Sequence, residues 1–418
     1  MPALLRERNV ALLISAALIS SFGDTILAIA LPFYVYDLTQ SALATGAMFI
    51  ASTLPGLLIG SVAGVFVDRW NRRRTMVVAD LTRVGLMLLL LGVHSRDTVW
   101  IAYVVAFIES AISRFFGPAK SALIPHLVSA ERLTATNALD SVSENIVNLI
   151  APTAGGALQV LAGLPAVVLV DSVSFLLSAM LTAGIVVPPS LRDSVPGPAV
   201  EASVRAWVRV WHDWLEGLRL IGRQRLLIVL FIVMGLAMLG QGLLTALNVV
   251  FVRTVLHGSA QVFGWMVTAA GVGGLLGGIA VARMKAIVPP TSLIVLGLEA
   301  VGVILVVRTN VPDLPLFLLL TAMAPLFITG LAVSIQTLLQ RGVPDHFRGR
   351  VFGAFGTTTS LLVLAGLGAG SVLGERLSVV SVLDLAGMLF MGAGLVALLL
   401  LPTATVTMDE VAGDQKRR

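Results

Sequence analysis

Twelve long apolar stretches, with few charges inside them, dominate this 418-residue chain. They lie at roughly 10–36, 43–67, 75–93, 98–120, 135–160, 165–187, 226–252, 260–282, 291–308, 313–340, 350–372 and 380–401. Each stretch is long enough for one span, because a helix needs about 20 apolar residues to cross about 30 Å of hydrocarbon. Only 12% of the residues are charged, about half the share of an ordinary soluble domain. We therefore predict an all-α polytopic membrane protein with twelve transmembrane helices.

The longest gap between the apolar stretches, from Pro188 to about Arg225, divides them into two sets of six. We predict an N-terminal six-helix bundle over 1–187, a cytoplasmic linker over 188–225, a C-terminal six-helix bundle over 226–401 and a cytoplasmic tail over 402–418. In the linker, apolar residues recur at helical spacing next to several arginines, namely Trp207, Trp211, Trp214 and Leu218. This pattern is typical of an amphipathic helix that lies on the inner membrane surface.

The two halves carry a weak internal repeat. The segment Ser41 through Gly46 to Gly56-Leu-Leu-Ile-Gly60 recurs 218 residues later as Ser259 through Gly264 to Gly274-Leu-Leu-Gly-Gly278. Both copies fall on the second helix of their half, which is typical of duplicated transporter halves that move around a central site. The alternative is that glycines four residues apart serve only close helix packing.

The basic residues predict the orientation of the chain. With both termini in the cytoplasm, four basic residues fall in outer loops and two within spans, which leaves 22 of the 28 on the cytoplasmic side. The outer four are Arg96, Arg253, Arg308 and Arg376, and the two within spans are Arg83 and Arg114. Because Lys and Arg are enriched in cytoplasmic loops, we expect both termini in the cytoplasm.

Several ionisable residues lie inside the predicted spans: Asp24, Glu109, Arg114, Asp140, Glu144, Asp171 and Glu299. Each costs roughly 2.5–3.5 kcal/mol on insertion scales, so an intramembrane charge is a functional hypothesis by default. Asp24 and Glu109 fall near the middle of their spans, at the depth where a substrate site is expected. Asp171 lies only a few residues inside its span, where local capping is an alternative.

A polar stripe follows one face of the fifth predicted helix, with Asn137, Asp140, Glu144 and Asn148 spaced by 3, 4 and 4 residues. We expect this face to line a cavity, together with Glu299 of the ninth span. Asp140 is near the cytoplasmic end, where pairing with loop arginines is the alternative, whereas Glu144 is a full turn deeper and is a candidate proton carrier.

Proton coupling requires a carboxyl group that binds a proton from outside and releases it inside, and desolvation favours the protonated form of such a group. Asp24, Glu109 and Glu144 are the candidates. Arg114 is five residues from Glu109, about 140° around a helix, so the two are poorly placed to pair. We expect Arg114 to face an acid on another helix; a structural ion pair is the alternative.

The loop after the second span reads Gly64-Val-Phe-Val-Asp68-Arg69-Trp-Asn-Arg72-Arg73-Arg74. An acid at the end of one helix and a basic cluster opening the next can lock the two ends by charge and helix-dipole contacts. Contacts that break and re-form in this way gate a cavity. Positive-inside charge alone explains the arginines but not Asp68.

This loop resembles the G-x-x-x-D-R-x-x-R-[K/R] motif of the major facilitator superfamily, with Gly64, Asp68, Arg69, Arg72 and Arg73 matching and Asn71 replacing a glycine. Ala151-Pro152-Thr-Ala-Gly155-Gly156 is similar to the G-P-x-x-G-G antiporter motif of that superfamily, with alanine at its first position. Ser21-Phe-Gly23-Asp24, Arg114-Phe-Phe-Gly-Pro118-Ala119, Asn137-Ala138-Leu139 and Asp171-Ser-Val-Ser-Phe175 resemble the bacterial drug-efflux branch that includes macrolide and enterobactin exporters.

The resemblance implies two six-helix bundles and proton-linked export of small amphipathic, drug-like compounds from the bacterial plasma (inner) membrane by alternating access. A lysophospholipid, other lipid or siderophore transporter of the same fold is the alternative, and sodium is an alternative coupling ion. The membrane lipid is the expected surrounding partner, no nucleic acid is expected, and we expect a monomer.

Other classes of function lack their characteristic residues. The chain has no cysteine, and His94, His126, His212, His257 and His346 show no paired spacing, so we predict no metal site and no enzyme activity. The sequence has no G-x-x-x-x-G-K-[ST] stretch for ATP. We therefore expect no cofactor and a proton gradient as the energy source.

Overall fold

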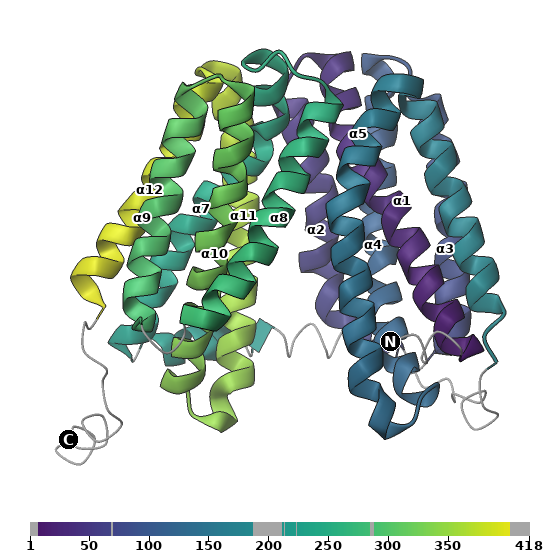
Figure 1. The fold of residues 1–418 in the computed structure, drawn as a ribbon, viewed down its shortest axis with the longest axis horizontal. Coiled ribbons are helices and arrows are strands. Elements are labelled where there is room, and N and C mark those ends of the chain that lie inside the picture. The colour runs from purple at the N-terminus through teal and green to yellow at the C-terminus, as the bar shows by residue number, and fades with distance from the viewer. Residues whose placement is uncertain are drawn as a thin grey trace.

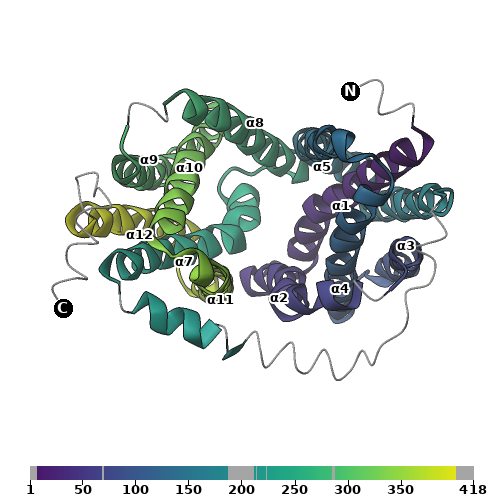
Figure 2. The same cartoon turned by 90° about the horizontal axis from the view of Figure 1, so that it is seen from below.

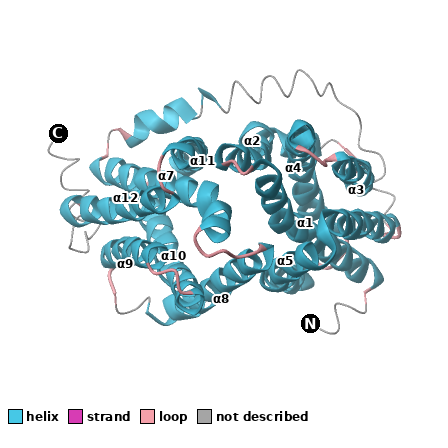
Figure 3. Cartoon of the chain, turned by 90° about the horizontal axis from the view of Figure 1, so that it is seen from above, coloured by secondary structure: helices cyan, strands magenta, loops and turns pink. Residues whose placement is uncertain are grey.

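The computed structural model describes residues 7–67, 70–186, 211–212, 214–222, 224–284 and 288–401, and within this part of the chain it contains helices but no strand (Figure 3). The long helices of the first half are α1 (Arg8–Thr39), α2 (Ala42–Val67), α3 (Arg72–Leu89), α4 (Val99–Leu123) and α5 (Ala130–Ala183). Those of the second half are α7 (Arg225–Thr254), α8 (Ala260–Met284), α9 (Pro290–Asn310), α10 (Leu314–Gly342), α11 (Arg348–Arg376) and α12 (Val379–Leu400). Short 3₁₀ turns are η2 (Leu90–Gly92), η3 (Arg96–Thr98), η4 (Ile124–His126) and η6 (Asp345–Phe347).

The helix α5 supplies two membrane passes rather than one. Its 54 residues would measure about 81 Å if straight, against about 30 Å of hydrocarbon. The helical path breaks at Gly163, whose backbone has φ 72° and ψ −179°, two residues before Pro165. Glycine takes this conformation without steric cost, so Gly163 turns the chain back. Eleven helices of the described chain are long and apolar enough to span a membrane, and this break gives the twelve predicted passes.

The helices form two bundles, α1 to α5 and α7 to α12 (Figure 1). Each bundle buries an apolar interior while large apolar side chains cover its outside; Leu161 of α5, for example, is 84% exposed. A soluble protein cannot leave so many such residues in water, whereas lipid accepts them. The prediction of an all-α membrane fold with two bundles is confirmed.

The first and last described residues lie on the same side of the bundles, which we call the termini side, and the opposite side is the distal side. Figure 1 shows the helices of the two bundles converging towards the distal side and spreading apart towards the termini side. The bundles contact one another through α2 against α11 and through α5 against α8 (Figure 2).

The repeated glycines lie at these two contacts. Gly46 of α2 is so close to Ser371 of α11 that a Cβ atom would collide with it, and Gly264 of α8 has the same relation to the Pro152 carbonyl of α5. The internal repeat therefore places equivalent glycines at the two crossings between bundles. Close helix packing is thus one role of the repeated glycines, while duplication of the halves stays a prediction.

Part of the predicted linker helix is described. Residues 214–221 are helical, and Trp214 donates a hydrogen bond from Nε1 to Thr358 Oγ1 of α11 at 3.2 Å. Glu216 pairs with Arg350 of α11 at 3.1 Å. The segment thus packs on the C-terminal bundle, while Trp207 and most of the arginines that support the surface-helix prediction lie outside the described residues.

Candidate functional site

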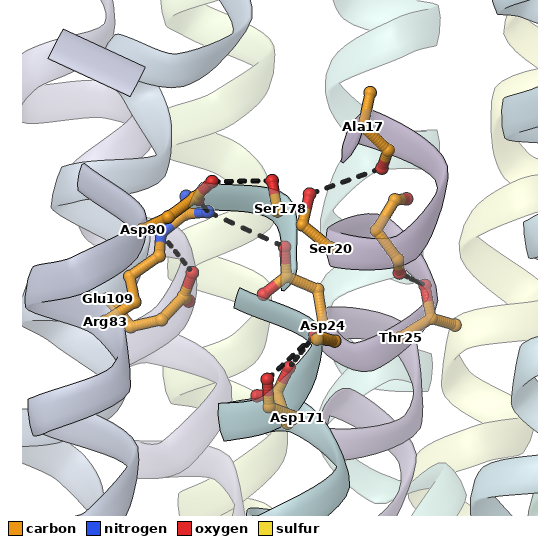
Figure 4. A network of polar contacts seen from close by, with 11 residues as sticks. Ala17, Ser20, Asp24, Thr25, Asp80, Arg83, Glu109, Asp171 and Ser178 are labelled. Atoms are coloured by element: carbon orange, nitrogen blue, oxygen red, sulfur yellow. Dashed lines mark hydrogen bonds and ion pairs between the residues drawn. The ribbon is translucent and has the colours of Figure 1, made fainter. Parts of the chain in front are cut away.

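A buried arginine stands at the centre of a network of polar side chains in the N-terminal bundle (Figure 4). The side chain of Arg83, on α3, is only 2% exposed. Its Nε atom lies 3.6 Å from Glu109 Oε1 of α4, and its Nη1 atom lies 4.0 Å from Asp24 Oδ2 of α1 and 3.6 Å from Asp80 Oδ1. We call Asp24, Asp80, Arg83, Glu109 and Asp171 the Arg83 network.

Aromatic rings and a serine complete the surroundings of Arg83. Its guanidinium carbon lies 5.0 Å from the ring centre of Phe175 and 5.7 Å from that of Phe116. Rings at this distance attract a desolvated cation. Ser178 donates a hydrogen bond to Asp80 Oδ2 at 2.6 Å, which ties α3 to the second pass of α5. The arginine is therefore held in place from three helices.

Asp171 is the fourth carboxylate of the network and is completely buried. Its Oδ1 atom accepts a hydrogen bond from Ser174 at 3.3 Å, and both residues pack against Gly23, the neighbour of Asp24. Oδ2 has no hydrogen-bond partner among the described residues. The local contact considered as the alternative for Asp171 exists through Ser174, but the residue also packs against the neighbour of Asp24.

The Arg83 network contains more acid than base. Three carboxyl groups lie within 4 Å of one guanidinium and Asp171 packs against the neighbour of Asp24, so full ionisation of all four acids would leave three uncompensated negative charges. Uncompensated charge is costly in a low-dielectric interior. Protonation removes such charge, so a group of acids of this kind is chemically suited to binding protons.

A second ion cluster joins α4 to α5 on the termini side. The Nζ atom of Lys120 lies 2.9 Å from Asp140 and 2.9 Å from Glu144, and Lys120 itself is buried. Asp140 therefore pairs with a helix lysine, where the sequence suggested loop arginines. Glu144 shares the same partner but has a 56% exposed side chain, so it also reaches open space.

Arg114 does not meet the expected acid. Its guanidinium packs over Gly56 of α2, where an added Cβ would lie 3.0 Å from Cζ. Among the described residues, no carboxylate lies within ion-pairing distance of Arg114. The expectation failed because a glycine on α2 leaves room for the guanidinium, and this tertiary contact is invisible in the sequence of α4.

The remaining residues expected to line a cavity lie in two different places. Asn137 and Asn148 are exposed on α5, on the same face as Glu144. The backbone carbonyl of Asn148 approaches Gly271 of α8. Glu299, in contrast, packs against Gly394 in the contact between α9 and α12. These two helices lie on the side of their bundle away from the N-terminal bundle (Figure 2), so Glu299 is poorly placed for a cavity between the bundles.

The loop motif is described only in part, because Asp68 and Arg69 lie outside the described residues. Gly64 is in the last turns of α2, and Arg72 begins α3. Arg73 donates hydrogen bonds to the Thr182 and Ala183 carbonyls at the end of α5. A basic side chain commonly binds the free carbonyls of a helix C-terminus in this way.

Asn71 and the antiporter-like segment both have structural roles. Asn71, which replaces a motif glycine, caps α3 by accepting a hydrogen bond from the Arg74 amide at 3.0 Å. Gly155 packs against the Ile26 backbone of α1, and Gly156 against the Ala260 backbone of α8. Together with the Pro152 carbonyl at Gly264, this segment forms the crossing where α5 contacts the other bundle.

Polar contacts on the distal side also join the bundles. Glu375 at the end of α11 accepts hydrogen bonds from the Ser41 hydroxyl at 2.5 Å and the Leu43 amide at 2.9 Å, at the start of α2. Arg253 of α7 lies 2.9 Å from Asp37 of α1. A carboxylate at a helix N-terminus is favoured by the helix dipole, so Glu375 caps a helix of the opposite bundle.

Sequence reasoning missed three members of these clusters. Arg83 was assigned to a span without a role, and Asp80 and Lys120 were not considered as site residues. A signal for the first two was present, because an acid and a base three residues apart inside an apolar span share one helix face. Lys120 directly follows the Arg114–Ala119 segment and gave no signal of its own.

Comparison with known proteins agrees with this architecture. The family described as transmembrane secretion effector matches residues 2–415. The chain is 26% identical to macrolide efflux protein A of Streptococcus pyogenes, over 86% of this chain and 88% of that protein. It is 28% identical to the multidrug efflux pump Tap of Mycolicibacterium fortuitum, over 83% of this chain and 84% of that protein.

Among solved structures, the fold is similar to a bacterial homologue of the iron transporter ferroportin in an inward-facing state. The TM-score is 0.75 at 17% identity, and the alignment covers 95% of this chain and 99% of that one. At this identity the likeness concerns the fold alone. The chain is thus a multi-pass membrane transporter, and it belongs to the transmembrane secretion effector family of the major facilitator superfamily.

Proposed function

We propose that the protein exports small amphipathic, drug-like compounds in exchange for protons by alternating access. The observation that carries this proposal is the Arg83 network, in which three carboxyl groups share one guanidinium inside the N-terminal bundle and Asp171 lies close by. Such a group of acids suits reversible protonation, and the names of the two efflux relatives support drug-like cargo. No cofactor is needed, because the proton gradient supplies the energy.

Protons and substrate act on the same network in this proposal. Asp24 and Glu109 are its partly exposed members, with side chains 35% and 20% exposed, whereas Asp80 and Arg83 are buried. A cationic substrate near Asp24 and Glu109 competes with protons for the same negative charge. Binding of one therefore favours release of the other, which is the requirement for exchange.

The conformational part of the proposal uses the contacts between bundles. We place both termini in the cytoplasm of a bacterial cell, and the distal contacts at Glu375 and Arg253 then close the outer side. Breaking them while the motif at Gly64–Arg73 closes the inner side would expose the network outwards. Glycine contacts at Gly46 and Gly264 give the two crossings about which the bundles can rock.

Proton movement in proteoliposomes tests this function. An imposed pH gradient and an internal pH-sensitive dye report proton flux while cationic and neutral amphipathic drugs are added in turn. We expect drug-dependent flux in the unmodified protein and its loss in Glu109→Gln and Asp24→Asn. Glu299→Gln, a carboxyl-to-amide change between α9 and α12, is the matched control and keeps the flux.

The same series decides the alternatives. Glu144→Gln tests the proton role predicted for that residue, since its partner Lys120 remains in place. Folded protein that gives no proton flux with any drug would reject drug antiport in favour of lipid or siderophore cargo or of another coupling ion. A monomer is expected, and gel filtration of the same sample measures it.

A further inference from the structure

A second buried arginine lies in the C-terminal bundle, and no acid accompanies it. Arg308 is 6% exposed, near the distal end of α9. The positive-inside count placed it in an outer loop, but the helix continues past it to Asn310. Arg308 is therefore a buried cation inside a helix rather than a loop residue, and it needs an explanation.

The surroundings of Arg308 are neutral. Its Nη1 atom donates to Thr321 Oγ1 of α10 at 3.3 Å, and its Nη2 atom donates to Asn248 Oδ1 of α7 at 3.3 Å. The ring centre of Phe317 lies 5.4 Å from the guanidinium carbon. The Nε atom has no hydrogen-bond partner in the part of the chain that the structure describes.

Two acids near Arg308 in the sequence or the fold accept hydrogen bonds from other groups. Asp384 of α12 accepts hydrogen bonds from Thr309 at 2.7 Å and from Asn310 at 2.8 Å. Asp313 caps α10 by accepting from the Leu316 amide at 2.9 Å. Over the described ranges, neither these nor any other carboxylate lies within 4 Å of Arg308.

The two halves use their buried arginines in related ways. Arg83 extends from the third helix of its half towards acids on the first and fourth helices, Asp24 and Glu109. Arg308 extends from the third helix of its half towards the first and fourth helices too, but meets Asn248 and Thr321. The C-terminal bundle thus has a buried arginine on its third helix that lacks negative partners among the described residues.

We propose that Arg308, Asn248 and Thr321 bind a small monovalent anion, either a halide ion or the carboxylate group of an organic molecule. An unpaired buried charge is costly, and an anion would compensate it. Arg308 uses only part of its five donor hydrogens. The amide of Asn248 and the hydroxyl of Thr321 now accept from Arg308, and both groups can also donate, so three side chains can converge on one anion.

The test of this site does not depend on the proposed export of drugs, because anion binding is measured without transport. Radioactive chloride binding to purified protein in a halide-free methanesulfonate buffer provides the test. We expect saturable binding of about one chloride per chain, weakened at least tenfold in Arg308→Gln. Arg253→Gln is the matched control, since Arg253 is also a distal arginine but is paired with Asp37, and it binds chloride normally.

Two milder variants control for misfolding of Arg308→Gln, and displacement measurements identify the anion. Asn248→Leu and Thr321→Val each remove one donor and are expected to weaken chloride binding severalfold without unfolding the protein. Displacement of chloride by acetate would identify a carboxylate site, and displacement by bromide alone would identify a halide site. Absence of saturable binding of both radioactive chloride and radioactive acetate in the unmodified protein, or unchanged binding in a folded Arg308→Gln protein, overturns the proposal.

Discussion

Replacing Arg83 with leucine is expected to destabilise the N-terminal bundle strongly. The change keeps an apolar side chain between the rings of Phe116 and Phe175 but removes the only cation that the described residues place within 4 Å of three carboxyl groups. Those groups then remain in the interior without a positive partner. The loss of stability should therefore come from stranded negative charge more than from lost packing.

The size of the effect follows from burial. Removing one partner of a buried ion pair costs about 3–5 kcal/mol, and Arg83 is almost inaccessible to solvent. At about 2–4 °C per kcal/mol for a unit of 150–250 residues, the melting temperature should fall by roughly 6–20 °C. The Arg253–Asp37 pair is much more exposed, so solvent screening limits Arg253→Leu to less than about 1 kcal/mol.

Thermal unfolding in detergent, followed by intrinsic fluorescence, measures both variants. Adding Asp80→Asn to Arg83→Leu should recover part of the loss, because it removes one stranded charge while Ser178 keeps a hydrogen-bond acceptor. Lowering the pH from 8 to 5 should also reduce the difference in melting temperature between the unmodified protein and Arg83→Leu, since protonation neutralises the stranded carboxylates. An Arg83→Leu protein as stable as Arg253→Leu, or a deficit independent of pH, would refute the charge argument.

Three further predictions concern contacts elsewhere in the two bundles. Gly156→Leu should separate α5 from α8, because its side chain must occupy backbone space, and disulfide cross-linking of engineered cysteine pairs across that contact should fail. Because the chain has no cysteine, a single Ser371→Cys substitution at the buried α2–α11 contact gives a thiol whose reaction with maleimide reports distal opening. Glu375→Gln should speed this reaction severalfold, and the control Asp345→Asn should leave its rate unchanged. Lys120→Met leaves two carboxylates without a cation and should cost about 3 kcal/mol; an unchanged melting temperature would mean that the cluster contributes nothing.

The overall fold was predictable because its determinants are local. Long apolar stretches, the gap at 188–225 and the positive charges between stretches each have a direct physical meaning in a membrane. Even the turn at Gly163 falls in the predicted interval between the spans 135–160 and 165–187. The structure added the tertiary use of the repeated glycines, which the sequence could identify only as a repeat.

The site was predictable only in part because charge partners belong to different helices. Asp24 and Glu109 were identified as mid-span acids, but nothing in either helix indicates that both approach Arg83. Arg114 and Arg308 were placed wrongly from the sequence: an acid was expected beside Arg114, and Arg308 was assigned to an outer loop. The packing of one over Gly56 and the burial of the other against Asn248 depend on neighbouring helices that the sequence does not position.

Substrate-induced proton release tests the central claim most directly, namely that the carboxyl groups of the Arg83 network carry the coupled proton. Purified protein in weakly buffered detergent solution is mixed with a compound that drives flux in proteoliposomes, and the pH change is recorded. The account predicts proton release by the unmodified protein and by Glu299→Gln, and reduced release by Glu109→Gln and Asp24→Asn. Equal proton release by all four proteins would contradict it.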